Sequence, residues 1–332
     1  MKTNSVKKTF ETFFFGAAKI LIALVVLLSC NTEKLQVKPM EKELVIESTG
    51  GHIHGTLLTP GDSTIKYPLV IIIAGSGPTD RNCNSQMMRS DAYKLLADSL
   101  MKKGIASFRY DKRGIGASND FKMNEADLRF DDFVEDAYFC VTHFSSENKF
   151  SKIIIAGHSE GALIGLLASK QGNVAGYISI CGAGRPIDVV LKEQLAKQPD
   201  EVKKVCYGII DCLKKGETVK DISADYASLF RESVQPYMIS WMKYDPAKEI
   251  SELKIPALIL GGDSDIQVSV ADADSLQNAN PNATYKIIAG MNHIFRTGFK
   301  NREENVAAYN KHDLPIASDL VKAISDFVLG LK

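Results

Sequence analysis

Short apolar runs alternate with amphipathic segments along most of this chain. Residues 69–74, 153–156 and 256–260 form uninterrupted apolar runs rich in isoleucine, leucine and valine. Such runs are typical of strands that are buried on both faces of a parallel sheet. The segments between them space their apolar residues near the helical period. The pattern therefore predicts an α/β fold, with a mostly parallel central sheet and helices on both faces.

The expected elements follow one another in a regular order. The strands are expected at residues 43–48, 52–59, 69–74, 105–109, 153–156, 177–181, 256–260 and 283–288. The helices are expected at residues 90–103, 127–144, 162–170, 268–278 and 314–329. Gly50 and Gly51 between the first two strands predict a hairpin. The later strands alternate with helices, which predicts βαβ units.

Residues 185–250 interrupt this alternation. The segment is rich in Lys and Glu, reads as helical and contains no clear strand. Because it lies between two βα units, we interpret it as an insertion into a core formed by residues 43–184 and 251–332. An apolar stripe runs through the insertion at Tyr226, Phe230, Val234, Tyr237, Met238, Trp241 and Met242. Core packing is the favoured role of this stripe, and a substrate-binding wall is the alternative.

The N-terminal segment has the pattern of an export signal. Basic residues come first, an apolar run follows at residues 20–28, and Ser29-Cys30 comes next. The run is shorter than the roughly 20 apolar residues that span a bilayer. Residues 27–30 resemble a bacterial lipobox, which implies that residues 1–29 are removed and that Cys30 carries lipid. An uncleaved membrane anchor and ordinary secretion are the alternatives, and residues 30–42 read as a tether.

The charge balance of the 332-residue chain separates into two parts. Forty basic and 40 acidic residues give a net charge of zero, and 45% of the residues are hydrophobic. This composition argues against a disordered chain and against a general nucleic-acid binder. Residues 1–29 carry a net charge of +3, which leaves 36 basic and 39 acidic residues. A mildly acidic surface attracts anionic lipid weakly, so lipid on Cys30 would hold the protein in the bacterial cell envelope, on the periplasmic or outer-membrane side.

A nucleophile motif follows one of the buried runs. Residues 157–161 read Gly-His-Ser-Glu-Gly, which fits G-x-S-x-G between an expected strand and an expected helix. In this context the motif makes a sharp turn that exposes the serine hydroxyl. The helix that follows favours negative charge at its N-terminus. We therefore interpret Ser159 as a catalytic nucleophile, against the alternative of a glycine-rich loop that only packs.

A serine nucleophile needs a base, and an acid that orients the base. For a strand-turn-helix motif of the G-x-S-x-G kind, the acid and then the base follow the serine in the chain. Among the six histidines, His293 lies in a loop after the last expected strand and fits the base, with His312 as the alternative. Asp263 and Asp265 compete for the acid in the loop after residues 256–260. An aspartate in such a loop can also cap the turn.

An oxyanion hole can be formed by two backbone N–H groups. One belongs to Glu160, directly after the nucleophile, and the other is expected from the loop at residues 75–82. The glycines of that loop permit tight geometry, and Ser76 is the candidate donor, against a Gly/Pro turn without a role. The cysteine spacings show no metal-binding signature. We predict neither a metal nor an organic cofactor.

Three motifs together carry a family resemblance. Residues 75–81, 110–118 and 157–161 resemble the α/β-hydrolase superfamily, in particular its serine aminopeptidase-like and carboxylesterase branch, and the likeness covers about residues 43–330. The superfamily pattern G-x-x-D-x-x-V is matched at positions 262, 265 and 268 and favours Asp265 over Asp263. The resemblance further implies that Asp111 and Arg113 brace the loop beside the nucleophile.

The resemblance also implies that the insertion caps the active site. We therefore expect a serine esterase that hydrolyses a small-molecule acyl ester through an acyl-enzyme. A peptidase or amidase acting on short peptides is the first alternative, in which Glu160 or Glu232 would hold the substrate amine. A surface protein that binds a ligand without turnover is the second. We predict no nucleic-acid partner and make no prediction of the oligomeric state.

Overall fold

The computed structural model describes residues 38–61 and 65–332 of the chain. The expected signal segment, the lipid site at Cys30 and most of the expected tether at 30–42 lie outside these residues. Within the described part, no helix combines the length and the apolar character needed to cross a membrane. The first strand begins at Met40, three residues before the expected hairpin.

An eight-stranded sheet forms the centre of the described chain, in the order β1-β2-β6-β3-β7-β8-β9-β10. The strands are β1 (Met40–Ser48), β2 (Gly51–Thr59), β3 (Leu69–Ile73), β6 (Ala106–Tyr110), β7 (Ile153–His158), β8 (Gly176–Ile180), β9 (Ala257–Gly262) and β10 (Thr284–Ile288). The hairpin β1-β2 and the pair β2-β6 are antiparallel, and the pairs from β6 to β10 are parallel. The predicted α/β architecture with a mostly parallel sheet is confirmed.

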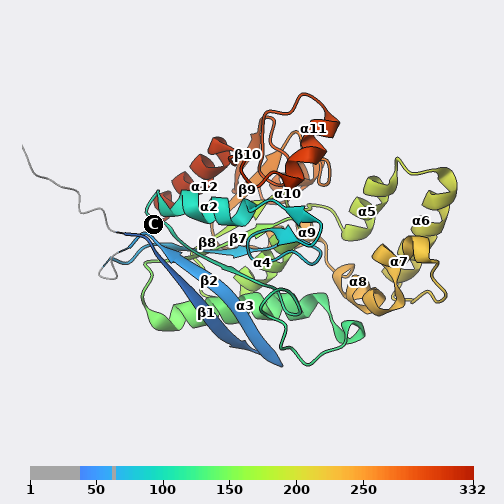
Figure 1. The fold of residues 1–332 in the computed structure, drawn as a ribbon, viewed down its shortest axis with the longest axis horizontal. Coiled ribbons are helices and arrows are strands. Elements are labelled where there is room, and N and C mark those ends of the chain that lie inside the picture. The colour runs from blue at the N-terminus through green and yellow to red at the C-terminus, as the bar shows by residue number, and fades with distance from the viewer. Residues whose placement is uncertain (1–37, 62–64) are drawn as a thin grey trace, which may run out of the picture. The chain divides into compact units, whose positions relative to one another are not determined.

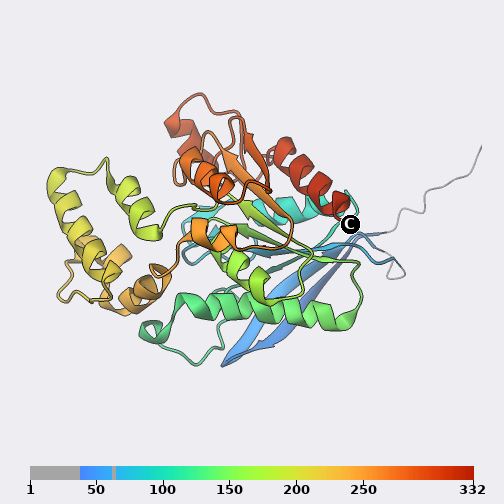
Figure 2. The ribbon, with the colours of Figure 1, turned by 180° about the vertical axis from the view of Figure 1, so that it is seen from behind.

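Helices cover both faces of this sheet (Figures 1 and 2). Helices α3 (Phe130–Glu147) and α4 (Glu160–Gln171) pack on one face, and α2 (Ala92–Met101) and α12 (Ser318–Gly330) pack on the other. Strand β3 shows why the sheet holds two cores. Its residues Leu69, Ile71 and Ile73 join the α3-α4 core, whereas Val70 and Ile72 join the α2-α12 core. Successive side chains of a strand point to opposite faces, so a continuous apolar run serves both.

Several element boundaries differ from the expected ones for local reasons. Helix α2 begins at Ala92 because Asp91 has a left-handed backbone, with φ 51°. Helix α3 begins at Phe130, after a capping box in which the Asp132 side chain accepts from the Arg129 N–H. Two short strands, β4 (Asn84–Ser85) and β5 (Met88–Arg89), were not expected. Pairs of residues are too short to produce a periodic signal. The helix α10 (Val270–Ala279) lies close to its expected bounds, and α11 (Arg302–Ala307) is an addition.

Five helices occupy the segment between β8 and β9. They are α5 (Ile187–Leu195), α6 (Asp200–Lys214), α7 (Ala224–Phe230), α8 (Gln235–Trp241) and α9 (Pro246–Ser251). Helices α5 to α8 gather together, away from α2 and α12 (Figure 1). The apolar stripe does not lie on one helix, because α7 ends at Phe230 and Pro236 stands in the first turn of α8. Proline lacks the N–H that would continue a helix through this point.

Candidate active site

Ser159 stands on a strained turn between β7 and α4. Its backbone has φ 54° and ψ −121°, a region that residues with a Cβ rarely adopt. The flanking glycines permit this turn. A Cβ on Gly157 would lie 2.0 Å from the carbonyl oxygen of Gly161, and a Cβ on Gly161 would lie 2.5 Å from that of Ala74. The sequence G-x-S-x-G thus produces a tight crossing of strand, turn and helix that holds the serine in one orientation.

The structure brings His293 and Asp265 together. Nδ1 of His293 lies 2.6 Å from Oδ2 of Asp265, and both side chains are at most 5% exposed. Oδ1 of Asp265 accepts from the N–H groups of Gln267 at 2.8 Å and Val268 at 3.0 Å. Burial opposes the ionisation of Asp265, but His293 and these two amides outweigh it and hold the pKa below its usual value. A carboxylate is thereby fixed against the imidazole.

Asp263 and His312, the alternatives for the acid and the base, lie outside this hydrogen-bonded pair. Asp263 accepts a hydrogen bond from the N–H of Gly290 at 2.6 Å, which is the turn-capping role considered for it. His312 is exposed in the turns that follow α11. Asp265 and His293, rather than Asp263 or His312, therefore form the hydrogen-bonded acid and imidazole of this site.

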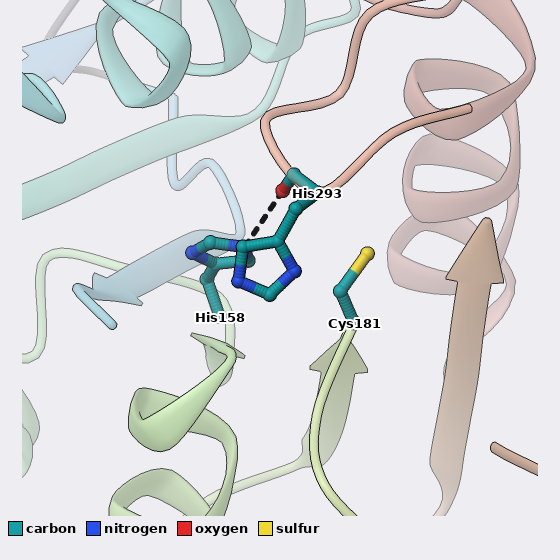
Figure 3. A group of neighbouring side chains, drawn as sticks. All are labelled: His158, Cys181 and His293. Atoms are coloured by element: carbon teal, nitrogen blue, oxygen red, sulfur yellow. Dashed lines mark hydrogen bonds between the residues drawn. The ribbon is translucent and has the colours of Figure 1, made fainter. Parts of the chain in front are cut away.

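A second histidine lies beneath the first. Nε2 of His158 lies 2.9 Å from the carbonyl oxygen of His293 (Figure 3), and its Nδ1 lies 2.7 Å from the hydroxyl of Tyr93. That hydroxyl also accepts from the N–H of Gly75 at 3.0 Å. A carbonyl can only accept, so Nε2 of His158 carries the proton and Nδ1 accepts from Tyr93. His158 links the loop of Gly75 to the loop of His293.

The sequence favours His293 as the base and assigns no role to His158. The structure shows that His158 positions His293 by holding the backbone of its loop. The one available signal was its place at the end of a buried strand beside the nucleophile, because a polar residue there needs hydrogen-bond partners.

His158, Cys181 and His293 form a compact group whose potential metal-binding atoms lie within 4.8 Å of one another (Figure 3). The hydrogen bonds already described use both ring nitrogens of His158 and Nδ1 of His293. Burial, with the nearby charge of Asp265, raises the pKa of the Cys181 thiol well above its usual value. Nε2 of His293 is then the one ring nitrogen of the two histidines that is left for a metal, and the thiol is not ionised. A metal would need further deprotonated ligands, so this group does not fit a metal site.

Burial of His158 predicts an acid-sensitive fold. Burial, together with the neighbouring His293, lowers the pKa of His158 well below its usual value. The unfolded chain binds a proton here below about pH 6.5, and the folded chain does not, so acid favours unfolding. We expect this residue to reduce the free energy of unfolding by up to about 1.4 kcal/mol per pH unit below about pH 6.5. Asp265 adds nothing in this window, because a depressed carboxylate pKa matters only below about pH 4.

Urea unfolding at pH 7.5, 6.5 and 5.5 measures this dependence. His158→Asn should make the slope of unfolding free energy against pH shallower by about one proton. The exposed His312→Asn is the matched control and should keep the wild-type slope. An unchanged slope in His158→Asn would contradict the assignment of a neutral His158.

The loop that supplies Ser76 lies against the nucleophile. A Cβ on Gly75 would lie 3.1 Å from Cβ of Ser159, so the loop approaches as closely as glycine allows. Ser76, Ser159 and Glu160 line one cavity. The N–H of Glu160 is the first of α4 and has no carbonyl partner within the helix. Both expected oxyanion donors thus belong to residues that border Ser159.

The side chain of Glu160 is committed to a buried network. Its Oε2 lies 2.8 Å from Nζ of Lys112, and both side chains are 3% exposed. The hydroxyl of Tyr237, on α8, donates to the other carboxylate oxygen. Lys112 also donates to the carbonyl of Gly75 at 2.7 Å. The charge of this buried carboxylate is balanced by Lys112. Its hydrogen bond with Tyr237 connects the insertion to the turn of Ser159.

The two expected bracing residues act in different places. The carboxylate of Asp111 accepts from the backbone N–H of Arg81 at 2.7 Å and from its guanidinium at 2.8 Å, so it braces the loop beside the nucleophile. Arg113 instead pairs with Asp136 of α3 at 2.6 Å. Arg113 therefore contacts helix α3, and not the loop beside the nucleophile that we expected it to brace.

Two cavities meet at Ser159. The larger has a volume of about 380 Å³ and an apolar wall from the insertion, formed by Ile187, Val190, Leu191, Leu229, Val234, Tyr237, Met238 and Trp241. The smaller has a volume of about 210 Å³ and contains His293. The apolar stripe therefore serves both roles considered for it, because Phe230 and Met242 are core residues while four other members line the larger cavity.

Solved esterases share the arrangement of these elements. Est1E from Butyrivibrio proteoclasticus, solved with ferulic acid bound, has a TM-score of 0.57 at 18% identity, covering 87% of this chain and 98% of its own. The Pyrococcus furiosus esterase Pf2001 has a TM-score of 0.56 at 14% identity, covering 91% of this chain and 95% of its own. This chain has the α/β-hydrolase fold. In this fold the turn between β7 and α4 holds Ser159.

The chain is also similar in sequence to a known family and to a known protein. Residues 86–235 match the family described as "Serine aminopeptidase, S33". Esterase EstD from Thermotoga maritima is 27% identical over 256 residues, which cover 72% of this chain. The match spans 58% of the length of EstD. The likeness in sequence and in fold thus extends to proteins described as esterases.

Proposed function

We propose that this protein is a serine esterase that hydrolyses carboxylic esters of small molecules through an acyl-enzyme. The observation that carries the proposal is the imidazole of His293, held at 2.6 Å by the buried Asp265 in a cavity shared with the strained Ser159. A nucleophile, a base and an orienting acid in this order are the parts that acyl transfer requires. The likeness to EstD supports an ester as the substrate.

The proposed reaction has two halves. In the first, Nε2 of His293 takes the proton of Ser159, whose Oγ attacks the ester carbonyl, while Asp265 stabilises the imidazolium. The N–H groups of Ser76 and Glu160 donate to the oxyanion. Collapse breaks the bond to the alcohol oxygen, which receives the proton from His293. In the second half, water attacks the acyl-enzyme by the same route and releases the carboxylic acid.

The surroundings of Ser159 favour an ester over a peptide with a free amine. A peptidase of that kind needs a free carboxylate to bind the amine, and the sequence offered Glu160 and Glu232. Glu160 is engaged by Lys112 and Tyr237, and Glu232 is exposed and accepts from the N–H of Asp221. The wall of the larger cavity is apolar instead. Such a wall suits the acyl chain of an ester.

Two esters that differ only in a free or capped amine test this preference. Alanine methyl ester and N-acetylalanine methyl ester should be hydrolysed with similar kcat/KM, within about threefold. Among the described residues that line the two cavities, Glu160 is the one carboxylate, and it is already engaged. The p-nitrophenyl ester of butyric acid should be a faster substrate than either. A loss of tenfold or more on capping the amine would contradict the esterase proposal and favour an aminopeptidase.

A further inference from the structure

Lys112 is a buried basic residue close to the nucleophile, and the two halves of the proposed reaction do not use it. Its side chain is 3% exposed. The ammonium group donates to the carbonyl oxygen of Gly75 at 2.7 Å and to Oε2 of Glu160 at 2.8 Å. It also lies 4.7 Å from the centroid of the Phe133 ring, a favourable position for a cation. A lysine ammonium has three N–H donors, and these three neighbours fix its position.

The hydrogen bond to Gly75 fixes a peptide plane beside Ser159. Gly75 and Ser76 are joined by a trans peptide bond, in which the C=O and the N–H point in opposite directions. Because Lys112 lies on the C=O side, the N–H of Ser76 points away from it. Within residues 38–61 and 65–332 that N–H has no hydrogen-bond acceptor, and Ser76 borders Ser159 in both cavities. The N–H is therefore free to donate to a substrate.

Gly75 is also held through its other polar backbone group. Its N–H donates to the hydroxyl of Tyr93 at 3.0 Å, on the opposite side of the residue from the carbonyl that Lys112 binds. The peptide that follows Gly75 cannot rotate unless the carbonyl loses its hydrogen bond with Lys112. Hydrogen bonds from a charged donor are roughly twice as strong as neutral ones, so Lys112 provides the firmer of the two contacts.

The same ammonium group holds the residue that carries the second proposed oxyanion donor. The backbone N–H of Glu160 is that donor, and the Glu160 side chain is bound by Lys112 and by Tyr237. Lys112 therefore connects Gly75, which precedes one donor, with Glu160, which carries the other. An ammonium group on a peptide carbonyl also polarises the peptide, which strengthens the hydrogen bond that its N–H can donate.

We propose that Lys112 is a positioning residue of the oxyanion hole, which orients and polarises the peptide between Gly75 and Ser76 so that the N–H of Ser76 donates to the oxyanion. The inference rests on the proposed esterase function. Lys112 lines neither cavity, so it acts through this peptide and not on the substrate. The oxyanion forms only during the reaction, so loss of Lys112 should lower kcat and leave KM nearly unchanged.

Lys112→Met, made together with Glu160→Gln, tests this role. Methionine has a similar shape without the ammonium group, and glutamine avoids a buried carboxylate without a partner. The reference is Glu160→Gln alone, in which Lys112 can still donate to Gly75. Loss of an oxyanion donor lowers kcat by about 10²- to 10³-fold, and here the N–H itself remains. We therefore expect a kcat for p-nitrophenyl butyrate about 10- to 100-fold below the reference, with KM within about twofold.

A trifluoromethyl ketone provides a second reading of the same double variant. The Oγ of Ser159 adds to the carbonyl carbon of 1,1,1-trifluoro-2-pentanone, its proton passes to His293, and the carbonyl oxygen becomes an oxyanion. The affinity for this ketone should fall by about the same factor as kcat/KM, because both depend on the oxyanion hole. A loss of kcat without a loss of this affinity would contradict the assignment.

Arg113→Met, made together with Asp136→Asn, is the matched control. It removes the ion pair of the next residue in the chain, whose side chains are 5% and 1% exposed, and it leaves Lys112 and Gly75 unchanged. The free energy of unfolding should fall, but kcat and the affinity for the ketone should stay near the wild-type values. Equal losses of kcat in the two double variants would overturn the assignment, because any buried ion pair beside β6 would then support the activity.

The amide signal of Ser76 tests the donor in the folded wild type, independently of the variants. In protein labelled with ¹⁵N-serine, the signal that is missing from Ser76→Ala should move downfield when the ketone binds. An unmoved signal, or a loss of kcat below about threefold on adding Lys112→Met to Glu160→Gln, would overturn the role of Lys112 while leaving the esterase function intact. Failure of the wild type to hydrolyse p-nitrophenyl butyrate would overturn the esterase function and this inference with it.

Discussion

Ser159→Ala is expected to abolish ester hydrolysis. The variant keeps the strained turn and the neighbouring N–H groups but lacks the oxygen that attacks the carbonyl, so no acyl-enzyme can form. We expect the kcat for p-nitrophenyl butyrate to fall by at least about 10³-fold, and labelling by a fluorophosphonate to disappear. The side chain is small and only a hydroxyl is lost, so thermal unfolding should change little.

Ser76→Ala is a useful control for this result, because the proposed oxyanion donor is the backbone N–H and not the side chain. Ser76 is exposed, and the substitution should retain labelling and most of the activity. Undiminished labelling of Ser159→Ala would show that another residue is the nucleophile.

Asp265→Asn is expected to reduce activity by about 10³- to 10⁴-fold. The amide carries no charge to stabilise the imidazolium of His293, and its NH2 group can turn toward Nδ1 and favour the wrong tautomer. The carboxylate is well placed for both roles, since it lies 2.6 Å from Nδ1 and accepts two backbone N–H groups. The measurement is kcat for p-nitrophenyl butyrate near neutral pH.

Asp263→Asn is the matched control, because it makes the same chemical change two residues earlier in the same loop. Asp263 accepts hydrogen bonds from the N–H of Gly290 and from the hydroxyl of Ser264, and an asparagine oxygen can accept them too. A loss of less than about threefold is therefore expected for Asp263→Asn. Comparable losses in the two variants would mean that the loop, rather than the acid at residue 265, supports the activity.

The sheet could be predicted from the sequence because its strands are buried on both faces. Runs such as residues 153–156 have no polar residue to confuse strand with loop, and Gly104 marks the end of α2 clearly. The helices of the insertion could not be predicted in the same way. The spacing of the apolar stripe fits one helix, but Pro236 breaks that helix. Some residues of the stripe then pack in the core, and others line the larger cavity.

The positions of Ser159, Asp265 and His293 could be predicted because each follows a strand, and the carboxyl ends of parallel strands meet at one edge of the sheet. The contacts that support these three residues could not be predicted from the sequence. Lys112 and Glu160 are 48 residues apart, and Tyr237 is 77 residues from Glu160. Contacts over such separations depend on how the insertion packs against the sheet, which no local pattern records. The hydrogen bonds of His158 to Tyr93 and to the loop of His293 also join residues far apart in the chain, so no local pattern predicts them.

The central claim is that Ser159 carries the acyl group of the ester. Acid quenching of the wild-type protein during turnover of p-nitrophenyl butyrate, followed by peptide mass spectrometry, tests it most directly. We predict one butyryl group on the peptide that contains Ser159, and none in Ser159→Ala. A butyryl group on a different residue of the wild type, or continued turnover by Ser159→Ala at the wild-type rate, would contradict it.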